Sequence, residues 1–171
     1  MTPEFSRRYA LDTIGGAGQR VAIEAFEGER AALAARFDLI ALDVLTATAT
    51  LVIVVGGAEA RGAVRARAVQ ACVVTGDRVT SDVDEPFALR FIDAPVTGDE
   101  EVELTDAECD LLPFDGGHID LGEAVAQTLG LALDPFPRSA TADEDRVWSA
   151  GPQGGAFAGL AALLPKDETR A

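Results

Sequence analysis

The chain has 171 residues, 48% of them hydrophobic, and a formal net charge of −15. Its length suits one domain with a sizeable core, and its hydrophobic content argues against global disorder. Residues 1–75 hold eight basic and eight acidic side chains, whereas residues 76–171 hold six basic and 21 acidic ones. Because like charges repel, the acidic half excludes uniform attraction to nucleic acid, so any RNA contact needs a local basic patch in the first half.

The first elements expected along the chain are two short strands and a helix. Alternation over Phe5–Leu11 predicts a strand, and Val21–Ile23 opens a second one after the glycine-rich stretch Gly15–Gly18. The Ala-, Arg- and Glu-rich stretch Glu27–Phe37 predicts a short helix. The glycine-rich stretch lacks the lysine of a phosphate-binding loop, so we interpret it as a turn.

A run of strands follows. Leu39–Val44 and Ala47–Val55 form two strands or one long bent strand, Gly62–Val74 is the next, and Phe87–Ile92 continues the sheet. The most apolar run, Leu45–Val55, is too short to span a bilayer, so no membrane partner is expected.

The strand expected over Gly62–Val74 has two chemically different faces. One face carries the arginines Arg61, Arg65 and Arg67. The other face carries Val64, Ala66, Ala68, Cys72 and Val74. The arginines are the best candidates for contacts to RNA phosphates, although an ordinary solvated sheet face explains them as well. Arg7 and Arg8 add to this patch if the first strand lies alongside.

The second half of the chain predicts a helix. Beyond the acidic stretch Thr97–Asp110, Asp120 can cap a helix, with Glu123 in the capping-box position. One helical stripe then follows, made of Leu121, Ala124, Val125, Thr128, Leu129 and Ala132. Pro135 and Pro137 end the helix.

These elements predict an α+β fold with a largely antiparallel β-sheet or partly closed barrel, a short helix after the second strand and a helix near 120–133. Residues 1–138 are expected to form a single α+β domain. Residues 139–171 are expected to form a mostly flexible tail with a short helical segment near 157–164.

No pattern of catalytic, metal-binding or cofactor-binding residues is visible, so we expect neither an enzyme nor a cofactor. His118 is the single histidine, and no GxSxG motif exists for it to serve. It is interpreted as a surface turn residue. Four acidic residues are candidates for a divalent cation in a nuclease, but a solvated loop explains them better. They are Asp99, Glu100, Glu101 and Glu103.

The two cysteines, Cys72 and Cys109, are far apart in sequence and do not form a disulfide framework. They fit a reducing compartment, and no secretory signal follows the N-terminal arginines, so a cytoplasmic location is expected.

Several stretches in order along the chain resemble the YceD family of large-ribosomal-RNA-subunit accumulation proteins. The similar stretches are Gly62–Ala66, Val69–Thr75, Asp84–Glu85, Phe87–Phe91, Ile119–Glu123, Leu131–Leu133, Pro137–Arg138 and Phe157–Leu163, and Glu27–Leu39 resembles the first helix of the family. No single stretch is very specific, whereas their order and spacing are convincing together.

The resemblance implies a non-enzymatic cytoplasmic factor that supports accumulation of large-subunit (23S) rRNA, by binding rRNA or a pre-ribosomal particle. It brings no catalytic residues. The alternative is an acidic protein-binding module that escorts a basic large-subunit ribosomal protein. Many family members have a C-x-x-C where this chain has Cys72 and Thr75. Because the second cysteine is missing, we expect Cys72 to be a packing residue rather than part of a metal site or redox pair.

Overall fold

The computed structural model describes residues 3–93, 110–114 and 116–142. The chain divides into one unit, Met1–Ser139, and a second, Ala140–Ala171, and the fold described below is that of the first. Among the described residues, no helix has the length and apolar character needed to cross a membrane. Most of the expected tail, including the helical segment near 157–164, lies outside the described residues and stays a prediction.

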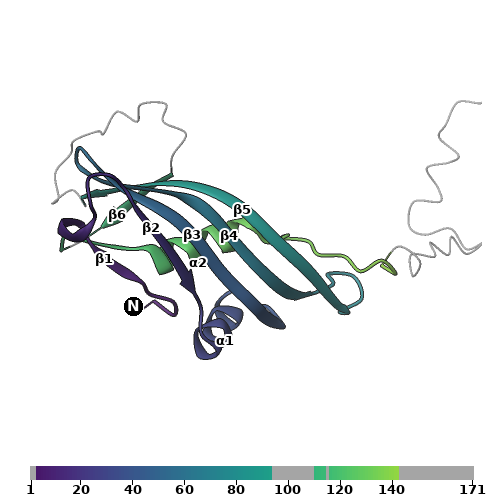
Figure 1. The fold of residues 1–171 in the computed structure, drawn as a ribbon. Coiled ribbons are helices and arrows are strands. Elements are labelled where there is room, and N and C mark those ends of the chain that lie inside the picture. The colour runs from purple at the N-terminus through teal and green to yellow at the C-terminus, as the bar shows by residue number, and fades with distance from the viewer. Residues whose placement is uncertain (1–2, 94–109, 115, 143–171) are drawn as a thin grey trace, which may run out of the picture. The chain divides into compact units, whose positions relative to one another are not determined.

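A five-stranded sheet forms the centre of the first unit (Figure 1). Its strands are β2 (Gln19–Glu24), β3 (Ala41–Val54), β4 (Gly57–Ala71), β5 (Arg78–Asp93) and β6 (Asp110–Phe114), in that spatial order. The first three pairs of neighbours are antiparallel, and β6 pairs with β5 in parallel.

A second, two-stranded sheet and two helices complete the described fold. Strand β1 (Arg8–Ala10) pairs antiparallel with β7 (His118–Asp120), and a short 3-10 helix, Leu11–Thr13, follows β1. Helix α1 (Glu27–Arg36) contacts β3, and helix α2 (Leu121–Ala132) contacts β4 and β5. Figure 1 shows α2 lying across one face of the five-stranded sheet, here called the inner face.

Strand alternation gives the sheet one buried and one exposed face. The inner face is formed by buried apolar residues of β3, β4 and β5. They include Leu45, Leu51, Val64, Ala66, Phe87, Leu89 and Phe91. From α2, the residues Leu121, Ala124, Val125 and Leu129 are buried against this layer. The opposite, outer face carries the polar and charged residues of the same strands.

Two glycines allow backbone segments to approach closely. A Cβ on Gly62 in β4 would lie 1.9 Å from the carbonyl oxygen of Thr48 in β3. A Cβ on Gly122 in α2 would lie 2.7 Å from the backbone nitrogen of Arg7 and 2.8 Å from the carbonyl oxygen of Phe5. Any larger residue at either position therefore forces two main chains apart.

The α+β class, the largely antiparallel sheet and both helices are confirmed, and the sheet is not closed into a barrel. Of the alternatives for residues 39–55, the single long strand is the one observed, as β3 (Ala41–Val54), with an irregularity between Leu42 and Val44. The strand expected over Gly62–Val74 begins earlier and ends at Ala71, so Val74 lies outside it and is exposed. Strand β5 begins well before Phe87 because its first half alternates acidic residues with β-branched ones.

Candidate nucleic-acid interface

The three arginines expected on one face of a strand do share the outer face of β4. Arg61, Arg65 and Arg67 are exposed, and Val64 and Ala66 between them are buried on the opposite face. Neighbouring strands place hydroxyl groups beside them, because Thr46 pairs with Arg65 and Thr50 pairs with Arg61 across β3. The outer face is thus a polar surface rich in arginine and threonine.

Each of these arginines has an acidic partner. Arg65 Nε lies 3.2 Å from Asp84 Oδ2, and Arg67 Nε lies 2.7 Å from Asp82 Oδ1 across the β4–β5 pair. Arg61 Nη2 lies 3.4 Å from Glu59 Oε2 on its own strand. The side chains of the two cross-strand pairs are all more than half exposed. Such pairs stabilise a fold by about 0–1 kcal/mol, so a phosphate can replace the carboxylate at small cost.

The ion pair between Arg67 and Asp82 shifts the pKa of both side chains. The hydrogen bond from Arg67 holds the pKa of Asp82 below its usual value, and the same bond raises the pKa of Arg67. Asp82 therefore stays ionised at neutral pH, and it competes with any anion for Arg67.

The expectation that Arg7 and Arg8 join this patch through the first strand is wrong, because β1 pairs with β7 and not with the five-stranded sheet. Arg7 instead forms a two-bond ion pair with Glu29 of α1, at 2.7 and 2.8 Å. Its guanidinium also lies 4.7 Å from the ring centre of Phe5 and 5.1 Å from that of Phe26. This arrangement is structural, since it joins the N-terminal segment to α1.

The expected helix cap is present and connects α2 to the N-terminal segment. The Asp120 carboxylate accepts hydrogen bonds from the backbone N–H groups of Gly122, Glu123 and Arg7, and from the Ser6 hydroxyl. The Glu123 side chain does not return to the cap but forms a two-bond ion pair with Arg36 at 2.9 Å.

Cys72 is buried as expected, but its surroundings differ from the apolar strand face that parity predicts. It follows the end of β4, and its Sγ accepts the N–H of Thr75 at 3.5 Å and that of Ser139 at 3.3 Å. Hydrogen bonding from the Thr75 side chain and then from the Ser139 backbone lowers the pKa of the Cys72 thiol to about 6, although burial opposes the shift. The Thr75 hydroxyl proton also has a competing acceptor in the Asp77 carboxylate, at 2.7 Å.

His118 lies exposed at the start of β7, where its Nδ1 is 2.8 Å from the Gly116 carbonyl oxygen. It borders a surface depression of about 570 Å³ that also touches Arg8, Asp120 and Glu123. The two carboxylates there are engaged by backbone N–H groups and by Arg36. His118 thus has the setting of a turn residue beside the start of α2.

Within residues 3–93, 110–114 and 116–142, no group of three or more His, Cys, Asp and Glu side chains is placed to hold a metal ion. The candidate acidic group at 99–103 and Cys109 lie outside the described residues.

Arg20 on β2 also belongs to this interface, and the alternation of residues within β4 did not predict it. It lies on the outer face because it pairs with Thr50, which in turn pairs with Arg61. The signal in the sequence was the alternation of Val21 and Ile23 with polar neighbours, which placed Arg20 on the face opposite the core. Its distance from Arg61 depended on strand order, which alternation does not give.

A comparison with protein-family models gives one match, to the family described as Large ribosomal RNA subunit accumulation protein YceD, over residues 60–163. The match covers more than half of the chain and contains β5, α2 and all of β4 except its first three residues. The likeness of Glu27–Leu39 to the first helix of the family lies outside the matched residues. Neither a curated protein nor a solved structure matches the chain.

Proposed function

The chain belongs to the YceD family of large ribosomal RNA subunit accumulation proteins, and from this premise we propose that it binds large-subunit (23S) rRNA or a pre-ribosomal particle in the cytoplasm. It acts in this proposal as a non-enzymatic biogenesis factor. The family description supports a role connected with the ribosome, and the RNA contact itself is the proposed part.

The observation that carries the proposal is the row of arginines on the outer face of β4. Arg61, Arg65 and Arg67 are exposed on one face of the sheet, and their weak surface ion pairs can be exchanged for phosphate oxygens. Their planar guanidinium groups suit phosphate, because they donate two parallel hydrogen bonds. Repulsion by the acidic second half keeps such binding local and moderate in strength.

Binding of labelled 23S rRNA fragments over a range of salt concentrations tests the proposal. Wild-type affinity should fall as salt rises, and replacing all three arginines by glutamine should lower the affinity and flatten the salt dependence by about one unit of slope per lost contact. Arg8→Gln is the control for each single arginine replacement, since it also removes one positive charge but from β1, outside the five-stranded sheet. No measurable wild-type affinity, or an affinity independent of salt, contradicts direct RNA binding.

A second candidate function is escort of a basic large-subunit ribosomal protein. It is supported by the acidic excess of residues 76–171 and by the exposed Asp82, Asp84 and Glu85 on β5. Pulldown from nuclease-treated extract should then recover a basic ribosomal protein, and Asp82→Asn with Asp84→Asn should reduce the yield. Recovery of RNA alone in untreated extract, with no basic ribosomal protein in either extract, argues against the escort.

A further inference from the structure

Three side chains form a straight row across the outer face of the sheet. Arg20 of β2 pairs with Thr50 of β3, and Thr50 pairs with Arg61 of β4, so all three point to the same side. Adjacent strands are about 4.8 Å apart, which places the two arginine Cα atoms about 10 Å apart with the threonine midway. Two flexible guanidinium groups at this separation can reach one anion between them.

The row borders a shallow depression of about 540 Å³. Small residues form its floor, because the next row on the outer face consists of Ala22 of β2, Thr48 of β3 and Ala63 of β4, and Gly62, which also lines the depression, has no side chain. The depression is therefore a feature of the backbone, with arginines on two of its sides.

Charge is distributed unevenly along the outer face. At the end near the β3–β4 turn, the described outer face carries Arg20, Arg61 and Arg90 together with Glu59, which pairs in register with Arg90 and lies 3.4 Å from Arg61. Within the described residues Arg20 forms no ion pair, and it is exposed.

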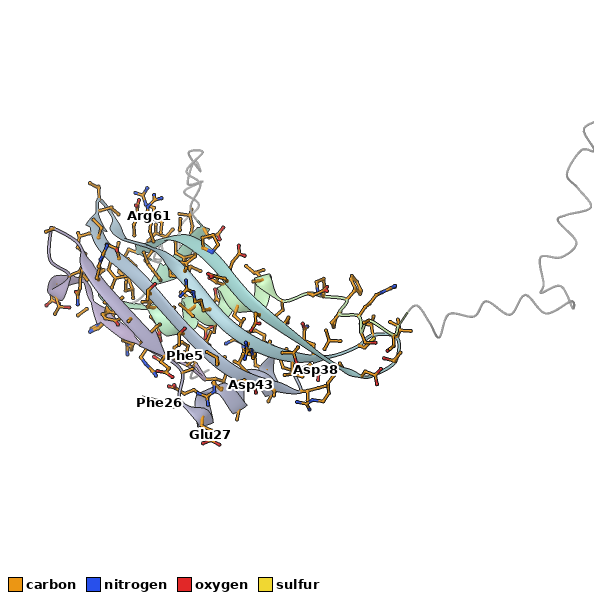
Figure 2. All side chains as sticks on the ribbon, turned by 45° about the vertical axis from the view of Figure 1, so that its right-hand side comes forward. Phe5, Phe26, Glu27, Asp38, Asp43 and Arg61 are labelled. Carbon is orange, nitrogen blue, oxygen red and sulfur yellow. The ribbon has the colours of Figure 1, made fainter. Side chains whose placement is uncertain are left out.

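Toward the opposite end of the face, Arg65 pairs with Asp84 and Arg67 pairs with Asp82. Glu24 of β2 lies on the same face at this end. Figure 2 shows Arg61 at the other end of the sheet from Asp38 and Asp43. Among the described residues, arginines therefore outnumber carboxylates at the first end, whereas Arg65 and Arg67 at the second end each pair with an aspartate.

We propose that this depression binds one phosphodiester group of the RNA backbone, with Arg20 and Arg61 donating from two sides and the Thr50 hydroxyl from between them. This inference rests on the proposed RNA binding and adds its main phosphate contact, which includes a residue of β2. Arg65 and Arg67 contribute less to this contact, because they do not line the depression. The contacts are to the backbone, so they carry no base preference.

The test measures affinity for the same labelled rRNA fragments with Arg20→Gln, Arg61→Gln, the double variant and Thr50→Val. Each arginine variant should weaken binding about tenfold at low salt and lower the salt slope by about one. The double variant should lose less than the product of the two single effects, because both arginines hold the same phosphate. Thr50→Val should weaken binding a few-fold without changing the slope.

Arg78→Gln is the matched control, since Arg78 starts β5 at the acidic end of the sheet, and it should change affinity less than twofold. Thermal unfolding of every variant confirms that the sheet is retained. Salt-dependent wild-type binding that Arg20→Gln and Arg61→Gln reduce no more than Arg78→Gln overturns the phosphate site and leaves RNA binding intact. Absence of wild-type binding overturns both. Equal competition by inorganic phosphate, at the same phosphate concentration as the RNA, assigns the depression to small anions and overturns the RNA assignment.

Discussion

Asp120 connects three segments through one carboxylate, so its removal should destabilise the fold more than loss of an ordinary helix cap. Oδ1 accepts the N–H groups of Gly122 and Glu123 at 3.1 and 3.2 Å and that of Arg7 at 2.8 Å, while Oδ2 accepts the Ser6 hydroxyl. Losing a cap costs about 1 kcal/mol, and a partly buried N–H without a partner costs about 1–3 kcal/mol. Asp120→Ala should therefore lower the free energy of unfolding by about 2–4 kcal/mol.

Equilibrium unfolding in urea measures this loss, and a slope of about 2 kcal/mol/M converts it to a midpoint shift of about 1–2 M. Asp120→Asn keeps a carbonyl oxygen for the three N–H groups. It loses the charge at the helix start and the acceptor of the Ser6 hydroxyl, but the Ser6 oxygen can instead accept from the new amide, so the substitution should cost about 1 kcal/mol. Asp134→Ala is a matched control, because Asp134 accepts a single exposed N–H, that of Phe136. If Asp120→Ala costs no more than Asp134→Ala, or if Asn is as harmful as Ala at position 120, the reasoning is wrong.

Three further stability predictions follow from single contacts. Arg36→Gln should lower the free energy of unfolding by about 1 kcal/mol at pH 7, because it removes the ion pair with Glu123. That pair stabilises the fold only while the Glu123 carboxylate is ionised, so the difference from wild type, measured by urea unfolding, should shrink as the pH falls through the lowered pKa of Glu123. Gly62→Ala should destabilise the fold strongly, because its Cβ would meet a carbonyl oxygen. Gly28→Ala in α1, where the added Cβ has open space around it, should instead raise the free energy of unfolding by about 0.5–1 kcal/mol, and equal effects of the two substitutions would contradict this account. With the other cysteine changed to serine, the ultraviolet absorbance of the Cys72 thiolate should titrate with a pKa near 6. The stability of that protein relative to its Cys72→Ser version should rise between about pH 6 and pH 9, whereas titration near the usual thiol pKa of 9.0 would contradict the hydrogen-bonding account.

Local signals in the sequence were sufficient for most of the fold. The composition of Glu27–Phe37 and the Asp120 cap predicted both helices, and alternation placed Arg61, Arg65 and Arg67 on one face of β4. These features depend on neighbours within a few residues along the chain.

Features set by contacts between distant segments were missed. The pairing of β1 with β7 joins residues more than a hundred positions apart, and nothing in Arg8–Ala10 distinguishes it from a strand of the main sheet. The hydrogen bond from Ser139 to Cys72 and the row formed by Arg20 and Arg61 likewise require the order of the strands. Parity assigns a residue to a face but does not say which residues of other strands lie beside it.

The separation of the two faces of the sheet also decides how the proposed function can be tested. Val64, Phe87 and Leu89 are buried on the inner face beneath α2, so changes there act on stability first. Arg20 and Arg61 are exposed on the outer face, where their replacement leaves the core unchanged and exposed ion pairs contribute little to folding. A loss of RNA affinity in outer-face variants with unchanged unfolding free energy is therefore evidence about binding. The same loss in an inner-face variant would follow from unfolding alone, and for this reason the decisive variants are those on the outer face.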